Sequence, residues 1–321
     1  MKLKAQNRIV TAALVLLLLL VVFGALLSGA PPARATEAFT LKVRSAPVGM
    51  ATDHERSRYW LLDKASGRLS LTALGTDGAV QGHMTSRDTL VNATGLAYDA
   101  GELYVGDVGG ERPEVTVYQV MEPWPATDIL KAVPFVLTYP DGVHAGTAIL
   151  LDRDGRLHVV TGGDAPGIYA APVAPSSSEP NLLERVADAP AGTTDATVLR
   201  DGRWIVRTAT TLVTLDATTH EPIGQVEIGV EETGQVLAQG LADDTVLTAM
   251  GPGGLVTSTE IPGPAPTATP APARTRAAAP RPVVAEAEDD AVTFEQTGTT
   301  FALGAAVAVA ALAGLVVLVR R

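Results

Sequence analysis

A phrase of about ten residues recurs through the middle of the chain and limits the folds that the chain can adopt. It reads RDGRLHVVTGG from Arg153 to Gly163, RDGRWIVRTAT from Arg200 to Thr210, and more loosely DAGELYVGDVG from Asp99 to Gly109. Aligned on this phrase, the chain contains five copies of one short β-rich segment, which begin at Arg58, Glu102, Arg156, Arg203 and Thr245. Their spacings of 44, 54, 47 and 42 residues match the period of about 40–50 residues that is typical of propeller blades.

Each copy of the segment has similar neighbours. An apolar stretch that ends in a turn precedes it, as in TGLAYDAG, and a further short strand follows it, as in VTVYQV, often with a fourth such as FVLTYP. Asp-Gly and Ala-Gly between β-rich runs are typical of hairpins, because Gly tolerates the positive φ of a tight turn. Four antiparallel strands per unit, with no amphipathic helix between units, predict an all-β fold, a β-propeller of about five four-stranded blades. A β-sandwich is the alternative, but it does not explain the period.

One strand at the start of the domain has no unit of its own. The segment FTLKVRS, Phe39 to Ser45, alternates the apolar Phe39, Leu41 and Val43 with polar residues, which is the pattern of a strand with one buried face. The fifth unit, in turn, lacks an obvious fourth strand before Pro262. We therefore expect the N-terminal strand to pair with the last blade and close the ring, which removes two exposed sheet edges.

The first 35 residues have the pattern of an export signal. MKLKAQNR carries three positive charges, and no charged residue follows between Ile9 and Leu27. Ala33-Arg34-Ala35 is a cleavage motif, so residues 1–35 are predicted to be a signal peptide that is removed before Thr36. An uncleaved signal anchor is the alternative, because the apolar run is longer than usual for a signal peptide. Either outcome places the following domain, residues 36–260, outside the cytoplasm.

The C-terminal part predicts a stalk and a membrane anchor. Residues 261–299 are rich in Pro and Ala and are predicted to form a disordered, extended spacer. Residues 300–321 contain an uncharged run from Phe301 to Val319, long enough at about 1.5 Å per residue for a transmembrane helix. The terminal Arg320 and Arg321 place the C-terminus in the cytoplasm. We therefore expect a single-pass protein of the cell membrane with its propeller outside.

The same tail resembles a cell-wall sorting signal, in which a Leu-Pro-x-Thr-Gly pentapeptide precedes an apolar run and a basic end. The corresponding residues here are FEQTG, Phe294 to Gly298, which keep the Thr-Gly pair but lack the Leu and the Pro. Retention in the membrane is therefore the favoured prediction over transfer to the wall.

Charge limits the class of partner. The segment from Thr36 to Val319 holds all 35 acidic residues and 18 of the basic ones, a net charge of −17. A surface of this charge repels nucleic acid and anionic lipid headgroups. The chain has no Cys, so the exported domain has no disulfide, and its core alone must hold the fold together.

Common catalytic motifs are absent from the sequence. It contains no G-x-S-x-G elbow, no H-E-x-x-H, no Walker loop and no nucleophilic Cys. No two of its five His residues stand at metal-ligand spacing, so neither a metal nor a cofactor is predicted, and His158, inside a repeat strand, is expected to pack. The stretch DRDG, Asp152 to Gly155, begins like a calcium loop but lacks the later ligand positions, which favours a hairpin turn.

Two segments carry a resemblance to a known family. LYVGDVGGERPEVTVYQVMEP, Leu103 to Pro123, and YPDGVHAGTAILLDRDGRLHVVT, Tyr139 to Thr161, resemble an exported actinobacterial β-propeller family that is distantly similar to esterase-like phytase propellers. This chain keeps Asp107, Asp141 and His144 of the family pattern. It replaces most of the other acidic residues, with NATG for Asp-Trp-Glu-Asp, GGE in place of Gly-Asp-Asn, and HAGTA for His-Asp-Ala-Glu-Ala.

The resemblance implies a propeller that has lost most of a charged site, and it leaves two functions open. The first is a membrane-anchored, non-catalytic binding or scaffold module at the cell surface, whose partner is an extracellular protein or a cell-wall component. The second is a hydrolase of the esterase or phytase kind with a reduced acidic site. Enzymatic activity is thus uncertain and less expected than binding. In either case Asp107, Asp141 and His144 are the candidate ligand-binding residues.

Overall fold

The computed structural model describes residues 35–43, 45–228, 236–249 and 253–263, and these form strands joined by turns and loops. The predicted signal peptide, most of the stalk and both long apolar runs lie outside the described residues. Within the described ranges, no helix is long and apolar enough to cross a membrane.

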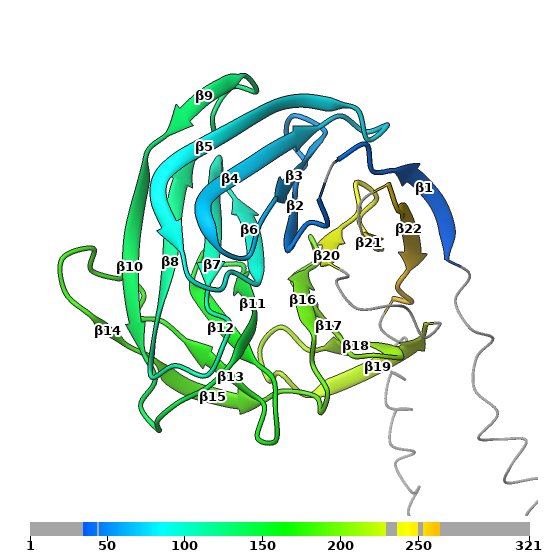
Figure 1. The fold of residues 1–321 in the computed structure, drawn as a ribbon. Coiled ribbons are helices and arrows are strands. Elements are labelled where there is room, and N and C mark those ends of the chain that lie inside the picture. The colour runs from blue at the N-terminus through cyan, green and yellow to red at the C-terminus, as the bar shows by residue number, and fades with distance from the viewer. Residues whose placement is uncertain (1–34, 44, 229–235, 250–252, 264–321) are drawn as a thin grey trace, which may run out of the picture. The chain divides into compact units, whose positions relative to one another are not determined.

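The strands form five sheets arranged in a ring, which confirms the predicted five-bladed propeller (Figure 1). Within each blade the neighbouring strands are antiparallel and follow one another outward from the centre. Blade I consists of β2 (Gly49–Asp53), β3 (Arg58–Leu62), β4 (Gly67–Leu74) and β5 (Val80–Leu90). Blade II consists of β6 (Gly95–Asp99), β7 (Glu102–Asp107), β8 (Glu114–Met121) and β10 (Ala132–Thr138).

The remaining blades have the same order of strands. Blade III consists of β11 (Gly146–Leu151), β12 (Leu157–Thr161), β13 (Gly167–Ala170) and β15 (Glu184–Asp188). Blade IV consists of β16 (Asp195–Val198), β17 (Trp204–Arg207), β18 (Thr211–Leu215) and β19 (Pro222–Glu227). Blade V consists of β20 (Val236–Gln239), β21 (Thr245–Ala249), β22 (Leu255–Glu260) and, from the other end of the chain, β1 (Thr36–Thr40).

The repeated phrase forms the turn into the second strand of a blade. Its five copies correspond to β3, β7, β12, β17 and β21. In the third blade, the Asp152 carboxylate accepts the backbone N–H groups of Asp154 and Arg156, and Gly155 adopts a φ of +75°. Since a positive φ favours Gly, DRDG is the predicted hairpin turn.

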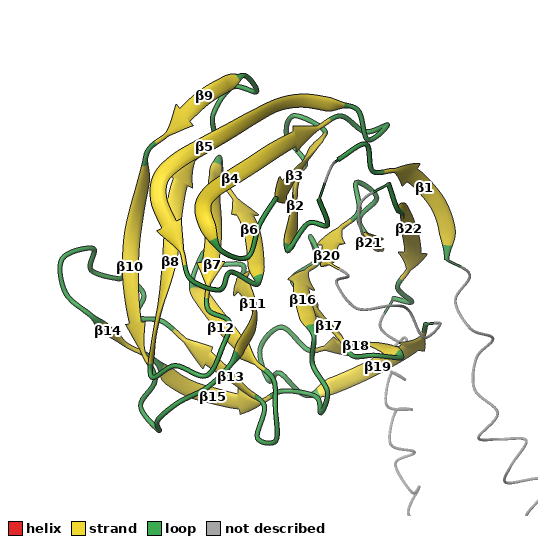
Figure 2. Cartoon of the chain, in the orientation of Figure 1, coloured by secondary structure: helices red, strands yellow, loops and turns green. Residues whose placement is uncertain are grey.

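Two short strands were not predicted. β9 (Thr127–Leu130) pairs in parallel with β5 of blade I, and β14 (Asn181–Leu182) pairs in parallel with β10 of blade II. Each comes from the following blade, just before the outermost strand of that blade, and Figure 2 shows both at the rim of the ring. They cover the outer edges of the first two blades, which limits edge-to-edge association there.

The core lies between the blades rather than within one blade. Five clusters of buried apolar side chains each join two neighbouring blades around the ring. The inner strands also approach closely at glycines: a Cβ on Gly95 would lie 2.9 Å from the backbone N of Ile149, and one on Gly146 would lie 2.7 Å from the Cβ of Val108. These positions therefore require Gly for close packing around the centre.

The ring is closed by the N-terminal strand, as predicted. β1 pairs antiparallel with β22, with Thr36 opposite Ser258. The strand occupies Thr36–Thr40 rather than the predicted Phe39–Ser45, although the Leu41 N–H still donates to the Gly254 carbonyl oxygen. Phe39 and Leu41 are buried as expected, and the Phe39 ring stacks on Tyr59 of blade I at 5.2 Å between centroids. The closing strand therefore joins blade V to blade I.

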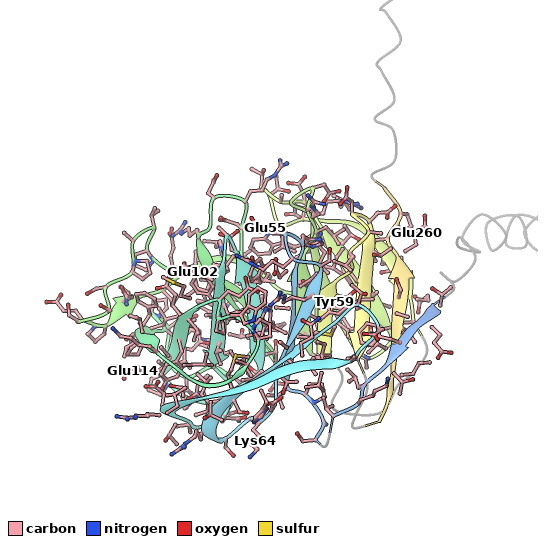
Figure 3. All side chains as sticks on the ribbon, turned by 90° about the horizontal axis from the view of Figure 1, so that it is seen from above. Glu55, Tyr59, Lys64, Glu102, Glu114 and Glu260 are labelled. Atoms are coloured by element: carbon pink, nitrogen blue, oxygen red, sulfur yellow. The ribbon has the colours of Figure 1, made fainter. Side chains whose placement is uncertain are left out.

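Strand direction defines two faces of the ring. All inner strands end at the face drawn upward in Figure 3, which carries the loops 54–57, 100–101, 152–156, 199–203 and 240–244 and which we call the upper face. They begin at the lower face, which carries the loops 63–66, 91–94, 108–113 and 139–145. Glu55 and Glu260 lie on the upper side in Figure 3, and Lys64 lies on the lower side.

Ring closure predicts a stability effect at the first strand. In the full chain, Leu41→Ala should lower the free energy of unfolding by about 2–5 kcal/mol, because it leaves a cavity in the cluster that joins blades V and I. Urea unfolding followed by Trp fluorescence measures this loss. The matched control is Lys42→Ala, at the exposed neighbouring position, which should change stability little. Equal effects of the two substitutions would contradict a closing role for this strand.

A buried carboxyl group in blade IV is expected to make the stability of the fold depend on pH. Asp195 is buried at the start of β16 and accepts the N–H groups of Leu237 in blade V and of Ala196. Burial raises its pKa to about 7, against the lowering effects of these hydrogen bonds and of Arg207. A carboxyl group whose pKa is higher in the folded than in the unfolded chain stabilises the fold at low pH, and this contribution is lost as the pH rises.

The stability of the wild type should therefore fall relative to that of Asp195→Asn between about pH 4 and pH 7, because the amide stays neutral throughout. Urea unfolding of both proteins at pH 4.5, 6 and 8 measures the difference. A difference that does not change with pH would show that Asp195 does not titrate in this range.

Candidate functional site

The three predicted ligand-binding residues lie at the lower face of blade II and in the loop that leads into blade III. Asp107 ends β7, and Asp141 and His144 lie in the loop between β10 and β11. Asp141 and His144 are in contact, with 2.9 Å between Asp141 Oδ1 and His144 Nε2. Asp107 makes no direct hydrogen bond to either of them.

Asp107 is surrounded by the groups that it holds in place. It is 2% exposed, and its two carboxylate oxygens accept the backbone N–H groups of Val91 and Asn92 at 2.9 and 2.6 Å. Arg112 donates to its Oδ1 at 3.2 Å and to its carbonyl oxygen at 2.7 Å. The backbone of Arg112 in turn bridges to that of His144. Asp107 therefore links three loops of the lower face.

Asp141 and His144 belong to a larger cluster with a tyrosine from blade III. The Tyr169 hydroxyl lies 2.9 Å from Asp141 Oδ2 and 3.0 Å from His144 Nε2. Arg185 of β15 donates from Nη1 to the Tyr169 oxygen at 3.0 Å and from Nη2 to Asp188 at 2.8 Å. We call Asp141, His144, Tyr169 and Arg185 the lower-face cluster.

A second tyrosine packs beneath this cluster. The Tyr139 ring lies 5.0 Å from that of His144 and 5.0 Å, edge-on, from that of Tyr169. Tyr139 is 4% exposed, and its buried hydroxyl makes no hydrogen bond to the described residues. Burial raises its pKa, so the hydroxyl stays protonated at neutral pH.

The hydrogen bonds indicate the protonation states of the cluster. Burial alone would raise the pKa of Asp141, but the hydrogen bonds from Tyr169 and His144 outweigh it and hold the pKa below its usual value. The carboxylate is therefore ionised, and Tyr169 donates its only hydroxyl proton to it. His144 then donates from Nε2, which leaves Nδ1 as an acceptor in the neutral ring. Nδ1 makes no hydrogen bond to the described residues.

Blade I carries a second polar cluster that the sequence did not reveal. Asp63 accepts hydrogen bonds from Ser70 at 2.5 Å and from Thr72 at 2.7 Å. The ring nitrogens of His83 lie 3.3 Å from Ser70 Oγ and 3.1 Å from Thr72 Oγ1. Ser70 and Thr72 are almost fully buried, so this cluster ties β4 to β5 rather than presenting a nucleophile to solvent.

A third polar cluster joins blades I and II at the upper face. Glu122 accepts hydrogen bonds from Trp60 at 2.9 Å and from Tyr98 at 3.3 Å, and it pairs with Arg56 at 2.5 Å. Burial raises the pKa of Glu122, and the neighbouring carboxyl of Asp53 raises it further, whereas the Trp60 hydrogen bond and the Arg56 charge lower it. Glu122, which follows β8 of blade II, thus contacts Trp60 and Arg56 of blade I and links the two blades.

Within the described ranges, no group of three or more His, Asp and Glu side chains could hold a metal ion. The His158 ring packs edge-on against Trp204 at 4.9 Å, as the sequence predicted, and burial lowers its pKa to about 4. The centre of the ring contains a cavity of about 60 Å³ near the ends of the inner strands. Such a volume holds about five waters.

Comparisons with known proteins give only remote structural likenesses. No family model matches the sequence, and the comparison with curated proteins gives no match. The structure is similar to virginiamycin B lyase from Staphylococcus aureus, with a TM-score of 0.43 and 9% identity, over 71% of this chain and 99% of the lyase. It is also similar to a gluconolactonase from Xanthomonas campestris, with a TM-score of 0.38 and 15% identity, over 72% and 95% of the two chains.

A protein from Lactobacillus plantarum is similar at a TM-score of 0.37 and 16% identity, and only 63% of its length is covered. These likenesses are too remote to transfer a site. The lyase and the lactonase are enzymes by name, and at these TM-scores the likeness carries no argument about the function of this chain. The resemblance to an exported actinobacterial family stays a prediction.

Tyr139, Tyr169 and Arg185 are the members of the site that sequence reasoning missed. Tyr139 directly precedes the Pro-Asp-Gly turn that contains Asp141, so its place beside the cluster could have been inferred from the chain. Tyr169 and Arg185 lie in other strands, and only the packing of blade III against blade II brings them to Asp141. No local sequence signal distinguishes them from other β-strand residues.

The cluster predicts the effect of removing one hydroxyl. Tyr169→Phe should raise the pKa of Asp141, because the ionised carboxylate loses one of its two side-chain hydrogen-bond donors. NMR titration of ¹³C-labelled Asp carboxyl groups measures this shift. A matched control is Tyr118→Phe, because Tyr118 has no hydrogen bond to Asp141. An unchanged Asp141 titration in Tyr169→Phe would show that the contact does not persist in solution.

Proposed function

We propose that this chain is an exported, membrane-anchored β-propeller that binds an extracellular protein or a cell-wall component through its lower face, without catalysing a reaction. The observation that carries this proposal is the state of the lower-face cluster. Its carboxylate, imidazole, hydroxyl and guanidinium groups already bind one another, and the exposed carboxylates of Asp141 and Asp188 lie at its surface.

The size of the central cavity supports binding at the surface. A drug-sized ligand needs a pocket of about 300–1,000 Å³. The cavity among the inner strands is far smaller, and it is lined by apolar residues such as Leu96 and Ile149 together with uncharged polar residues such as Gln239. It does not have the size or the charge to hold a phosphate ester.

The position of the chain ends supports the proposed anchorage. Thr36 lies opposite Ser258, and the Ile261 N–H donates to the Asp244 carbonyl oxygen in a loop of the upper face. Both ends of the described domain therefore lie at the upper face of blade V. The predicted spacer of residues 261–299 therefore leaves the domain from the face opposite to the lower-face cluster.

A hydrolase remains the second candidate because of one feature of His144. Its Nε2 is fixed by a carboxylate and a tyrosine hydroxyl, and in the neutral ring its Nδ1 would be an acceptor. This arrangement orients an imidazole in the way that a general base requires. Asp107 is buried and bound to other groups, so it would not reach a substrate. A reacting group would therefore have to approach Nδ1 of His144, beside Asp141.

The two candidates give opposite results in one set of measurements. The full chain in vesicles is incubated with cell-envelope extract, and bound components are cross-linked and identified. We expect one component that is retained by the wild type and lost in Asp141→Lys, since this change reverses the charge at an exposed carboxylate of the lower-face cluster. The matched control is Glu55→Lys, an equally drastic change at an exposed position of the upper face, which should retain that component.

The same preparations are tested with chromogenic carboxylic and phosphate esters. The binding proposal expects no turnover above background. Turnover that is present in the wild type and abolished in His144→Ala, with unchanged urea unfolding, would overturn the proposal and establish the hydrolase. Protection of the propeller from protease added to intact cells with an accessible surface would contradict the proposed anchorage.

A further inference from the structure

The lower-face cluster has hydrogen-bonding capacity that no group within the described residues uses. The Tyr169 hydroxyl donates its one proton to Asp141, and its oxygen accepts from Arg185 Nη1. His144 Nε2 lies within hydrogen-bonding distance of both Asp141 and Tyr169. Two acceptors stay free: the outer lone pairs of the Asp141 carboxylate, whose side chain is 40% exposed, and Nδ1 of the neutral His144 ring.

Both terminal nitrogens of the Arg185 guanidinium, in contrast, are already engaged. Nη2 donates to the Pro166 carbonyl oxygen at 3.2 Å and to Asp188 at 2.8 Å. Nη1 donates to Tyr169 and lies 3.7 Å from Asp141 Oδ2. An anion would therefore compete with two carboxylates for Arg185, whereas a group that donates hydrogen bonds would meet free acceptors.

A buried hydroxyl beside the cluster also lacks a partner. Tyr139 is 4% exposed, and its oxygen makes no hydrogen bond to the described residues. Besides burial, the groups that shift its pKa are Tyr169, Arg112 and Asp141, so the hydroxyl lies near them. Since buried hydroxyls are almost always hydrogen-bonded, this free oxygen favours a site that a further polar group joins from outside.

The charge around the cluster favours a cation. Arg112 and Arg185 are each paired with a carboxylate, of Asp107 and Asp188 respectively. Opposite charges attract and a patch of one sign concentrates counter-charged groups, so the lower face of blades II and III should select a positive group. The carboxylates that stand exposed in its loops and at its strand ends are Glu111, Glu114, Asp164 and Asp188.

We propose that the partner of the lower-face cluster presents a primary ammonium group, which donates to the Asp141 carboxylate and to Nδ1 of His144. This inference rests on the proposed binding function and specifies its chemistry. An ammonium group carries a positive charge and three N–H donors at the end of a flexible chain, so one such group can serve two acceptors. Lys side chains of an extracellular protein and free amines of a cell-wall component share this chemistry.

The first test uses small probes and the full chain in detergent micelles. The chain is labelled with ¹⁵N-histidine and studied at about pH 8, where an ordinary imidazole is neutral. Methylammonium should shift the Nδ1 signal of His144, which is assigned from the signal missing in His144→Gln. Tetramethylammonium has the same charge but no N–H donor, so it should bind at least about tenfold more weakly. Acetate should leave the signal unchanged.

Substitutions locate the response. Asp141→Asn removes the charge and keeps the shape of the side chain, so methylammonium should bind at least about tenfold more weakly. The matched control is Asp164→Asn, which removes an exposed carboxylate of the same face outside the cluster and should respond as the wild type does. Urea unfolding checks that both variants are folded, and the comparison of the two ammonium ions needs no variant.

Three results would overturn the inference: an equal response of His144 to methylammonium and tetramethylammonium, no response to either, or a response to acetate. An equal response would show attraction by charge alone, and a response to acetate would show that Arg185 binds an anion.

The cell-envelope extract identifies the source of the ammonium group. Acetylation of its amines removes their charge and should abolish retention of the component that the untreated extract supplies to the wild type. Loss of that component after protease digestion would identify Lys side chains as the source, and loss after digestion with a wall hydrolase would identify amines of the cell wall. Retention from the acetylated extract would overturn the inference and leave the proposed binding intact. If the wild type retains no component, the proposed function fails, whereas the probe titrations still decide the chemistry of the site.

Discussion

The pairing of β1 with β22 is the interaction on which the rest of the ring depends. In each of the other four blades the four antiparallel strands come from one stretch of the chain, but blade V is complete only when its outermost strand arrives from the N-terminal end. The same strand brings Phe39 onto Tyr59, so it also joins the last blade to the first. Because every core cluster lies between two blades, a ring that opens at this point exposes apolar surface on both sides of the gap.

A closed ring explains how distant residues form one site. Asp141 and His144 come from a loop after blade II, whereas Tyr169 and Arg185 come from two strands of blade III. Their contacts depend on the packing of the two blades, which the close approach of Gly146 to Val108 permits. The lower-face cluster is thus a product of the blade interface and not of one loop, and Asp107 contributes by holding the loops beside it.

The fold was predictable from the sequence because each blade repeats the same hairpin signals. The second strands, the DRDG turn and the closing strand follow from period and alternation alone. β9 and β14 were not predictable, because strands of two to four residues carry no period and pair with a different blade. The site was predictable only in part: Asp141 and His144 share one loop, but Tyr169 and Arg185 reach them through tertiary packing. The burial of Asp107 could not be read from its motif.

The antiparallel closure has a mechanical consequence. Since Thr36 and Ser258 lie side by side at the upper face, a force that separates the two ends of the domain acts at one end of the β1–β22 pair. The hydrogen bonds of an antiparallel pair are perpendicular to the strands, so this force loads them one after another, as in a zipper, instead of all together. The domain would therefore resist tension between its two ends less than a fold in which such tension shears the terminal strands past each other. A force applied to only one of the two ends does not pull β1 and β22 apart in this way.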